Sequence, residues 1–121
     1  MTVAATIDAE ELARRLDTLA VLDVRSAVEF DGTAGYPCDE RQGHIPGARH
    51  VELDRHARCL GPNEVRELVG LPEGTELVAY CHSGQRSGVA VQILRAAGYE
   101  ARNYEGSWHE WSRRADLPFE T

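Results

Sequence analysis

The sequence predicts an α/β protein built around a mainly parallel β-sheet with helices on both sides. Short apolar stretches suited to burial on both faces alternate along the chain with stretches whose apolar residues recur at helical spacing. The chain has 121 residues, of which 42% are hydrophobic and 27% are charged, as is usual for one globular domain. We therefore expect residues 1–121 to form a single domain.

The first part of the chain is predicted to form a helix, a strand, a short helix and a long loop. Asp8, with a glutamate three residues later, resembles a capping box that opens a helix through about Leu16. The apolar run 20–24 is the first buried strand, and a brief helix follows over 27–30. The polar segment 31–47 contains several glycines and prolines and is predicted as a loop. Loops of this length are more often functional than idle.

Two further strands and a helix are expected in the middle of the chain. Segments 48–53 and 77–80 are predicted as strands, and the second is the most strongly apolar of the predicted strands. Between them, 64–69 is predicted as a helix that ends at Gly70. Binding sites in parallel sheets lie at the carboxyl ends of the strands, and Cys81 directly follows one of these ends.

The last third of the chain contains the clearest helix, a final strand and a short helix. Residues 101–104 form the expected strand, and Ser107 is the expected N-cap of the last helix. We expect Trp108 and Trp111 to fill the core beneath that helix. The apolar stripe and the C-terminal stop of the clearest helix are Val89, Ile93, Leu94, Ala97 and Gly98.

Composition excludes several classes of partner. All 13 basic residues are arginine, and the net charge is −7. An acidic chain argues against a general nucleic-acid-binding surface, because phosphate binding needs clustered basic residues. The N-terminal residues do not resemble a signal peptide, and no later segment has the length and apolar character of a membrane span. We therefore expect a cytoplasmic protein with no nucleic-acid or membrane partner.

Cysteine and histidine spacing argues against a metal site. The chain has an odd number of cysteines and no C-x-x-C pair, which disfavours a disulfide framework and a zinc site. Three histidines recur every six residues from 44 to 56, but this spacing fits neither one helical face nor a known ligand pattern. We therefore predict no metal and no cofactor, and treat Cys38 and Cys59 as bystanders.

Cys81 is a candidate nucleophile because of the segment that follows it. A strand that turns directly into a helix points several backbone N–H groups at one spot, and the first helical turn adds partial positive charge. A cysteine at that spot has a lowered pKa, and Arg86 adds a fixed positive charge. On residue types alone, a small apolar residue at a strand end explains Cys81 equally well.

Four segments, taken in order, resemble the rhodanese family of sulfurtransferases. They are Leu22-Asp23-Val24-Arg25, Gly43-His44-Ile45-Pro46-Gly47-Ala48, the Cys81 loop with Gly84 in its middle, and Tyr104-Glu105-Gly106-Ser107-Trp108. The resemblance covers nearly the whole chain and implies a rhodanese-like three-layer α/β/α fold. Residues 106–118 are especially similar to the catalytic C-terminal half of two-domain thiosulfate and 3-mercaptopyruvate sulfurtransferases. The other half of those proteins helps form their cleft, which implies a more open site here or one completed by a second subunit.

The resemblance also implies the chemistry of the site. Cys81 would take the outer sulfur of a donor such as thiosulfate or 3-mercaptopyruvate, become a persulfide, and pass the sulfur to a thiol or to cyanide. Asp23 and Arg25 would brace the loop and the neighbouring chain. The loop that would bind the anion through its backbone N–H groups consists of His82, Ser83, Gly84, Gln85, Arg86 and Ser87.

Two other functions stay open at this point. One is a persulfide carrier or interaction module that a partner protein loads. For a sulfurtransferase or for such a module, we expect a monomer or homodimer that exchanges sulfur with a small donor, a thiol acceptor or a sulfur-relay protein. The other open function is a phosphatase or arsenate reductase of the same fold, whose members carry five residues between cysteine and arginine. Only four residues separate Cys81 from Arg86, and a shorter loop suits a sulfur atom better than a phosphoryl group.

The roles of two side chains of the loop also have alternatives. Arg86 is either a handle for the anionic group of a donor or a first-turn arginine with a local carboxylate partner. His82 either assists proton transfer and donor orientation, because imidazole titrates near neutral pH, or points outward from the loop.

Overall fold

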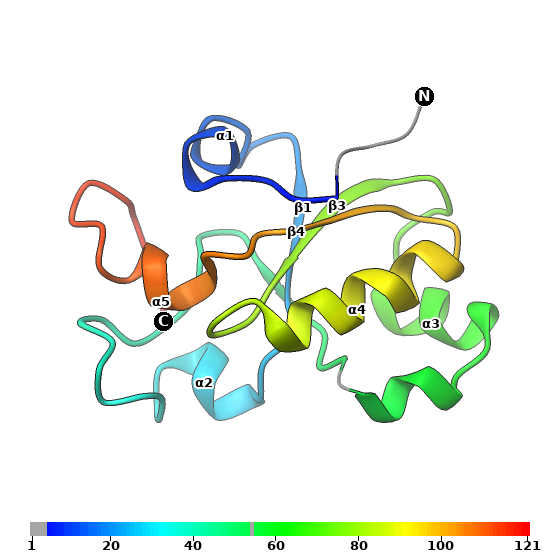
Figure 1. Cartoon of the computed structure of the whole chain (residues 1–121), viewed down its shortest axis with the longest axis horizontal. Helices are drawn as coiled ribbons and strands as arrows, with labels where there is room; N and C mark the ends of the chain where they lie inside the picture. Colours follow the sequence, from blue (N-terminus) through cyan, green and yellow to red (C-terminus); the bar gives the residue numbers. More distant parts are fainter. Residues whose placement is uncertain (1–4, 54) are drawn as a thin grey trace.

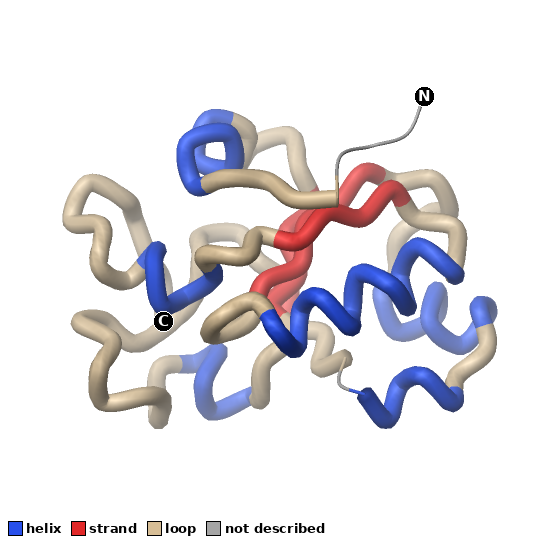
Figure 2. Tube along the Cα trace, viewed as in Figure 1, coloured by secondary structure: helices blue, strands red, loops and turns tan. Residues whose placement is uncertain are grey.

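A four-stranded parallel sheet forms the centre of the molecule. The computed structural model describes residues 5–53 and 55–121. The strand order is β2-β1-β3-β4, and all three pairings are parallel. This confirms the predicted α/β fold with a mainly parallel sheet, as Figures 1 and 2 show. The strands are β1 (Ala20–Asp23), β2 (Arg49–His50), β3 (Glu76–Tyr80) and β4 (Glu100–Asn103).

Helices cover both faces of the sheet (Figure 1). One hydrophobic core contains side chains of η1, α3 and α4, and the other contains side chains of α1 and α5. Among the residues that the structure describes, no helix combines the length and apolar character needed to cross a bilayer. The helices are α1 (Ala9–Arg14), α2 (Ala27–Asp31), the 3₁₀ helix η1 (Arg55–Cys59), α3 (Pro62–Val69), α4 (Gln85–Ala96) and α5 (Ser107–Trp111).

Side chains alternate between the two cores along β3 and into the residue that follows it. Leu77, Ala79 and Cys81 belong to the core that contains α3 and α4. Val78 and Tyr80 belong to the core that contains α1 and α5. Burial on both faces is the habit of a central parallel strand. The period of two therefore directs the Cys81 side chain toward the face of the sheet that α4 covers.

Two predicted elements end clearly earlier than expected. The strand expected over 48–53 contributes only Arg49–His50 to the sheet, because it lies at the edge and the chain then turns into η1, which the sequence did not indicate. The first helix begins after Asp8, whose carboxylate accepts a hydrogen bond from the Glu11 N–H at 2.8 Å. The Glu11 carboxylate forms ion pairs with Arg15 and Arg102, and the helix ends at Arg14.

Ser107 has a different role from the predicted N-cap. It is the first residue of α5 and has a left-handed backbone with a φ of 56°. Its Oγ accepts a hydrogen bond from the Cys81 N–H at 3.1 Å and donates one to the Tyr104 carbonyl at 2.8 Å. Ser107 thereby ties the end of β3 to the start of α5. Trp108 and Trp111 are completely buried, as predicted.

A buried ion pair joins the carboxyl ends of β1 and β3 to the segment before β2. The Arg25 guanidinium is 1% exposed and donates to Asp23 Oδ2 at 2.7 Å and to the Gly43 carbonyl at 2.6 Å. The Tyr80 hydroxyl donates to Asp23 Oδ2 at 2.7 Å and accepts from the Ile45 N–H at 3.0 Å. Burial and the Asp23 carboxylate raise the pKa of Tyr80, so its hydroxyl keeps its proton and remains a donor.

Replacing Arg25 is expected to destabilise the fold strongly. The Arg25→Met variant leaves the Asp23 carboxylate buried without its cation, which costs about 3–5 kcal/mol of unfolding free energy. Tyr80→Phe removes one hydrogen-bonding hydroxyl and is expected to cost about 1–3 kcal/mol. Urea denaturation of the two variants and the wild type measures both values. A loss below about 1 kcal/mol for Arg25→Met contradicts a structural role for this pair.

Candidate active site

Cys81 lies where β3 ends and the loop to α4 begins. Its Sγ accepts hydrogen bonds from the N–H groups of Gly84 at 3.1 Å and Ser87 at 3.4 Å. The Ser87 hydroxyl is a third donor, at 3.3 Å from the sulfur. The residue is 1% exposed, so these donors act on the sulfur in a largely water-free setting. We call this set of donors around Sγ the sulfur cradle.

The sulfur cradle changes the acidity of Cys81. Burial raises the pKa of the thiol, but hydrogen bonds from the Ser87 side chain and from the N–H groups of Ser87, Ser83 and Gly84 outweigh burial and lower the pKa. The first turn of α4 adds partial positive charge in the same direction. A lowered pKa increases the fraction of thiolate, which is the nucleophilic form of cysteine.

The Ser87 hydroxyl has two acceptors for one proton. It lies 3.3 Å from Cys81 Sγ and 2.7 Å from Asn103 Oδ1. The Asn103 amide is oriented by its Nδ2, which donates to the Gly84 carbonyl at 3.1 Å. When Cys81 is a thiol, the hydroxyl can donate to Asn103 and accept from sulfur. When Cys81 is a thiolate, the same hydroxyl can turn its proton to the sulfur.

Gly84 gives the loop its shape. It precedes α4 with a φ of 92°, a left-handed conformation that residues with a side chain rarely adopt. A Cβ atom at this position would lie 2.7 Å from the Glu105 carbonyl oxygen. The glycine predicted in the middle of the loop is therefore needed both for its backbone angle and for its close approach to the chain after β4.

Arg86 pairs with a carboxylate of α2. Its two Nη atoms donate to the two Oε atoms of Glu29 at 3.0 and 3.1 Å. Burial raises the pKa of Glu29, but Arg86 and hydrogen bonds from Ser26 together outweigh burial, and the pKa falls to about 2. This contact corresponds to the local-carboxylate alternative for Arg86. Its side chain is also 37% exposed, and its role toward a substrate stays a prediction.

The other loop side chains differ in their surroundings. Ser83 and Gln85 are exposed, and Ser83 acts on the sulfur through its backbone N–H. The His82 ring is half-buried and stacks on Tyr36 with ring centres 3.8 Å apart. Its Nε2 lies 3.1 Å from an Asp39 carboxylate oxygen, so the ring packs against the long loop between α2 and β2.

Several residues that surround Cys81 were missed in the sequence. Asn103 of β4 contacts the Ser87 hydroxyl, Ser107 of α5 accepts from the Cys81 N–H, and Glu29 is 57 residues from its partner Arg86. One signal could have found Asn103. It ends the strand adjacent to β3, and the carboxyl ends of neighbouring parallel strands lie at the same edge of a sheet.

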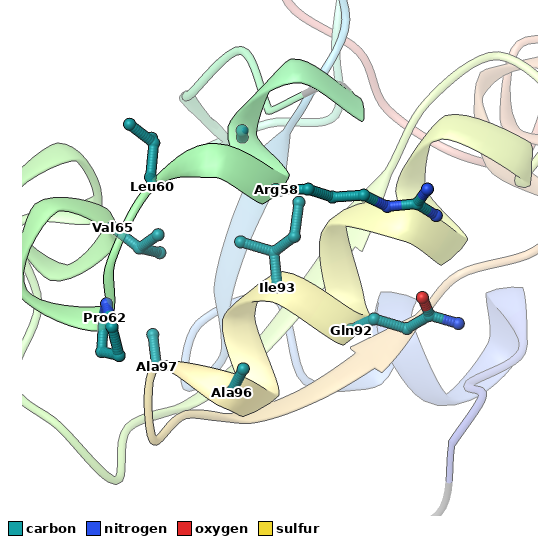
Figure 3. Close-up of a pocket in the computed structure, with 9 residues that line it drawn as sticks. Arg58, Leu60, Pro62, Val65, Gln92, Ile93, Ala96 and Ala97 are labelled. Carbon is teal, nitrogen blue, oxygen red and sulfur yellow. The ribbon is translucent and has the colours of Figure 1, made fainter.

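Two of the pockets outside the sulfur cradle differ in how they relate to the Cys81 loop. One, of about 200 Å³, is mainly apolar and lies between η1, α3 and the second half of α4, as Figure 3 shows. The other, of about 270 Å³, is lined by Glu29, Gly35, Tyr36 and Pro37. This second pocket adjoins the partners of Arg86 and His82, which makes it the better candidate for part of a substrate site. Neither Cys81 nor a residue of its loop lines the first pocket.

Comparison with known protein families matches the description "Rhodanese-like domain" to residues 8–114. The chain belongs to the rhodanese family. This confirms the resemblance inferred from the four segments. The chain is similar in structure to a solved protein described as a probable thiosulfate sulfurtransferase, with a TM-score of 0.83 and 44% sequence identity. That match covers 97% of this chain and 48% of the other.

Two curated relatives of this rhodanese chain carry named activities. It is 34% identical over 110 residues to a thiosulfate sulfurtransferase of Pseudomonas aeruginosa, covering 84% of this chain and 40% of the relative. It is also 34% identical over 119 residues to a 3-mercaptopyruvate sulfurtransferase of Escherichia coli K12, covering 90% and 42%. The rhodanese chain thus spans less than half the length of these relatives.

Removing the Ser87 hydroxyl is expected to raise the pKa of Cys81. Ser87→Ala deletes the side-chain donor to the sulfur and keeps the backbone donors, so the thiolate loses part of its stabilisation. The rate of Cys81 alkylation by iodoacetamide, followed on its peptide by mass spectrometry, should fall near neutral pH, and its pH profile should move to higher pH. Ser83→Ala keeps its backbone N–H and serves as the control. Identical profiles for Ser87→Ala and the wild type would contradict the role of this hydroxyl.

Gly84→Ala is expected to lower the unfolding free energy more than an alanine substitution at another left-handed glycine whose Cβ would meet no neighbouring atom. Gly74 has a φ of 87°, and a Cβ atom there meets nothing within 4 Å, which makes Gly74→Ala the matched control. Each variant pays about 1–2 kcal/mol for the left-handed backbone. Gly84→Ala also forces its Cβ against the Glu105 carbonyl. Chemical denaturation compares the two, and equal losses would show that the close approach to Glu105 is unimportant.

Proposed function

We propose that this chain is a sulfurtransferase that carries sulfur as a persulfide on Cys81. The observation that carries the proposal is the sulfur cradle, in which backbone and hydroxyl donors converge on one buried sulfur at the start of α4. The lowered pKa of the Cys81 thiol supports nucleophilic chemistry. The named activities of the two curated relatives point to the same reaction class.

The first half-reaction transfers one sulfur atom to Cys81. The thiolate attacks the outer sulfur of thiosulfate, a new S–S bond forms, and the bond between the two sulfurs of the donor breaks. Sulfite leaves with that electron pair, so the cysteine becomes a persulfide and no external oxidant or reductant is required. This is covalent catalysis, in which one difficult transfer is divided into two displacements.

The second half-reaction returns Cys81 to its thiolate form. A thiolate acceptor, or cyanide in an assay, attacks the outer sulfur of the persulfide and forms a new bond to it. The bond to Cys81 Sγ breaks, and its electron pair returns to the cysteine. The donors of the sulfur cradle stabilise the negative charge on sulfur at both stages, and because they are already in place they need little reorganisation.

The sulfur cradle also bears on the choice between sulfur and phosphate. Gly84 and Ser87 direct their N–H groups at Sγ itself, and four residues separate Cys81 from Arg86. A cradle centred on one sulfur atom favours a persulfide over a bulky tetrahedral phosphoryl group. The bidentate contact with Glu29 also neutralises Arg86, which weakens its attraction for a doubly charged phosphate. We therefore rank phosphatase and arsenate reductase chemistry below sulfur transfer.

The donor, the acceptor and the cellular setting are part of the proposal. Thiosulfate and 3-mercaptopyruvate are the candidate donors, and a thiol, free or on a sulfur-relay protein, is the candidate acceptor. A cytoplasmic location and a monomeric or homodimeric state stay predictions, as does the single domain over residues 1–121.

The Cys81→Ser variant tests the proposed function. We expect it to lose thiocyanate formation from thiosulfate and cyanide down to the uncatalysed rate, because the hydroxyl cannot form a persulfide. Intact-mass measurement after exposure to thiosulfate and, separately, to 3-mercaptopyruvate should show one added sulfur atom in the wild type and in the Cys59→Ser control. Peptide mapping should place the added sulfur on Cys81.

Three results would overturn or redirect this proposal. Sulfur that appears first on Cys38 or Cys59 would move the site. Cys81-dependent hydrolysis of p-nitrophenyl phosphate, without sulfur transfer, would favour a phosphatase. Loading of Cys81 by a cysteine desulfurase, with no turnover of either small donor, would favour a persulfide carrier.

A further inference from the structure

Four side chains that can bind a metal ion meet beside the Cys81 loop. Their ligand atoms all lie within 4.8 Å of one another and belong to Cys38, Asp39, His82 and His109. We propose that this group binds one zinc-type divalent cation. The site differs from the histidine series between residues 44 and 56, and it would revise the sequence-based expectation that the protein binds no metal.

The ligand atoms lie within 4.8 Å of one another, so small side-chain movements would bring them to the spacing of a tetrahedral site. Zinc lies about 2.0–2.3 Å from nitrogen, oxygen and sulfur ligands, which places the ligand atoms roughly 3.3–3.7 Å from one another. Asp39 Oδ1 is 3.1 Å from His82 Nε2 and 3.3 Å from His109 Nδ1. The two distances from Asp39 are thus at or slightly below this spacing, and every other pair of ligand atoms lies within 4.8 Å, so small rotations of the four side chains complete the set.

The donor set selects the kind of ion. Two imidazole nitrogens, one thiolate and one carboxylate are the ligands of zinc and similar borderline ions, whereas magnesium and calcium prefer several oxygens. A divalent ion bound by the Asp39 carboxylate and the Cys38 thiolate forms a neutral complex. On binding, the Cys38 thiol releases its proton to solvent, and each imidazole presents an unprotonated nitrogen to the ion.

The segment that carries Cys38 and Asp39 is held firmly against α5. Arg41 donates from its guanidinium to the carbonyls of Trp111 and Ser112 at 2.9 and 3.0 Å, and its own carbonyl accepts from Trp108 Nε1 at 3.0 Å. These contacts join positions about 70 residues apart. Figure 1 shows this part of the loop after α2 passing close to α5.

Further contacts fix the two histidines and Cys38. The backbone N–H of His109 donates to the His82 carbonyl at 3.0 Å, which keeps α5 next to the Cys81 loop. Tyr36 stacks on the His82 ring, and Arg113 donates to the Cys38 carbonyl at 2.9 Å. The ligands are thus brought together by the fold before any ion binds, which reduces the cost of organising the site.

Burial differs among the ligands in a way that suits metal entry. The Asp39 side chain is 1% exposed and contacts both histidine rings, so a cation would compensate a carboxylate that is already removed from water. Cys38 is exposed and His109 is 44% exposed, which leaves a path for the ion from solvent. Two of the cysteines therefore have different chemical roles, with Cys81 in the sulfur cradle and Cys38 at the cation site.

Zinc and cobalt binding to the reduced, metal-free full chain tests this proposal. We expect one Zn²⁺ per chain by competition with a chromophoric chelator. Co²⁺ should give intense tetrahedral d–d bands and a thiolate-to-cobalt charge-transfer band. Cys38→Ser and His109→Ala should each weaken Zn²⁺ binding by at least roughly tenfold. Cys59→Ser removes the other exposed cysteine and should leave binding unchanged.

A second measurement keeps the test independent of sulfur transfer and of misfolding. Zn²⁺ should raise the thermal unfolding midpoint of the wild type and of Cys59→Ser by clearly more than that of Cys38→Ser, whose circular dichroism without metal should match the wild type. The proposal is overturned if no stoichiometric Zn²⁺ binds or if Cys38→Ser binds Zn²⁺ as the wild type does. It is also overturned if the charge-transfer band depends on Cys81 and not on Cys38.

Discussion

The convergence of hydrogen-bond donors on Cys81 Sγ is the interaction on which the other features of this site depend. Gly84 and Ser87 can direct their N–H groups at the sulfur because the chain turns directly from β3 into α4. That turn requires a left-handed residue with no Cβ at position 84. The same donors outweigh the effect of burial on the thiol, so a buried cysteine becomes more acidic instead of less.

The two faces of β3 have separate tasks in holding this geometry. On one face, Cys81 packs with α4 and receives the Ser87 hydroxyl, which also contacts Asn103 of the neighbouring strand. On the other face, Tyr80 joins the buried Asp23–Arg25 pair. Tyr80 at the end of β3 and Cys81 directly after it therefore hold the ion pair on one side and the reactive sulfur on the other. A displacement of β3 would disturb both, which links stability of the sheet to reactivity of Cys81.

Local sequence patterns were sufficient to predict the parts of the fold that depend on neighbouring residues. The apolar runs, the stripe of α4 and the stop at Gly98 depend on periodicity and backbone preference, and these elements are present with small differences in length. The sequence indicates Cys81 as a candidate for the same reason, because its strand, loop and helix are consecutive. The length predicted for β2, residues 48–53, is too great, because only two residues of this run pair at the edge of the sheet.

Contacts between distant segments were beyond prediction from local patterns. The pairing of Arg86 with Glu29 spans 57 residues, and that of Arg41 with the carbonyls of α5 spans about 70. Ser107 was assigned to capping because serine favours that position, yet tertiary packing gives it a left-handed backbone and a contact with Cys81. The group of Cys38, Asp39, His82 and His109 has no spacing signature, because three separate segments contribute its ligands.

The amide proton chemical shifts of Gly84 and Ser87, followed by NMR as a function of pH, test the role of the sulfur cradle most directly. If these N–H groups donate to the sulfur, both signals should move downfield as Cys81 ionises, with one shared midpoint below the ordinary pKa of a cysteine thiol. The movement should be absent in Cys81→Ser. Signals that do not titrate, or that titrate with a midpoint at or above the ordinary value, would contradict the account.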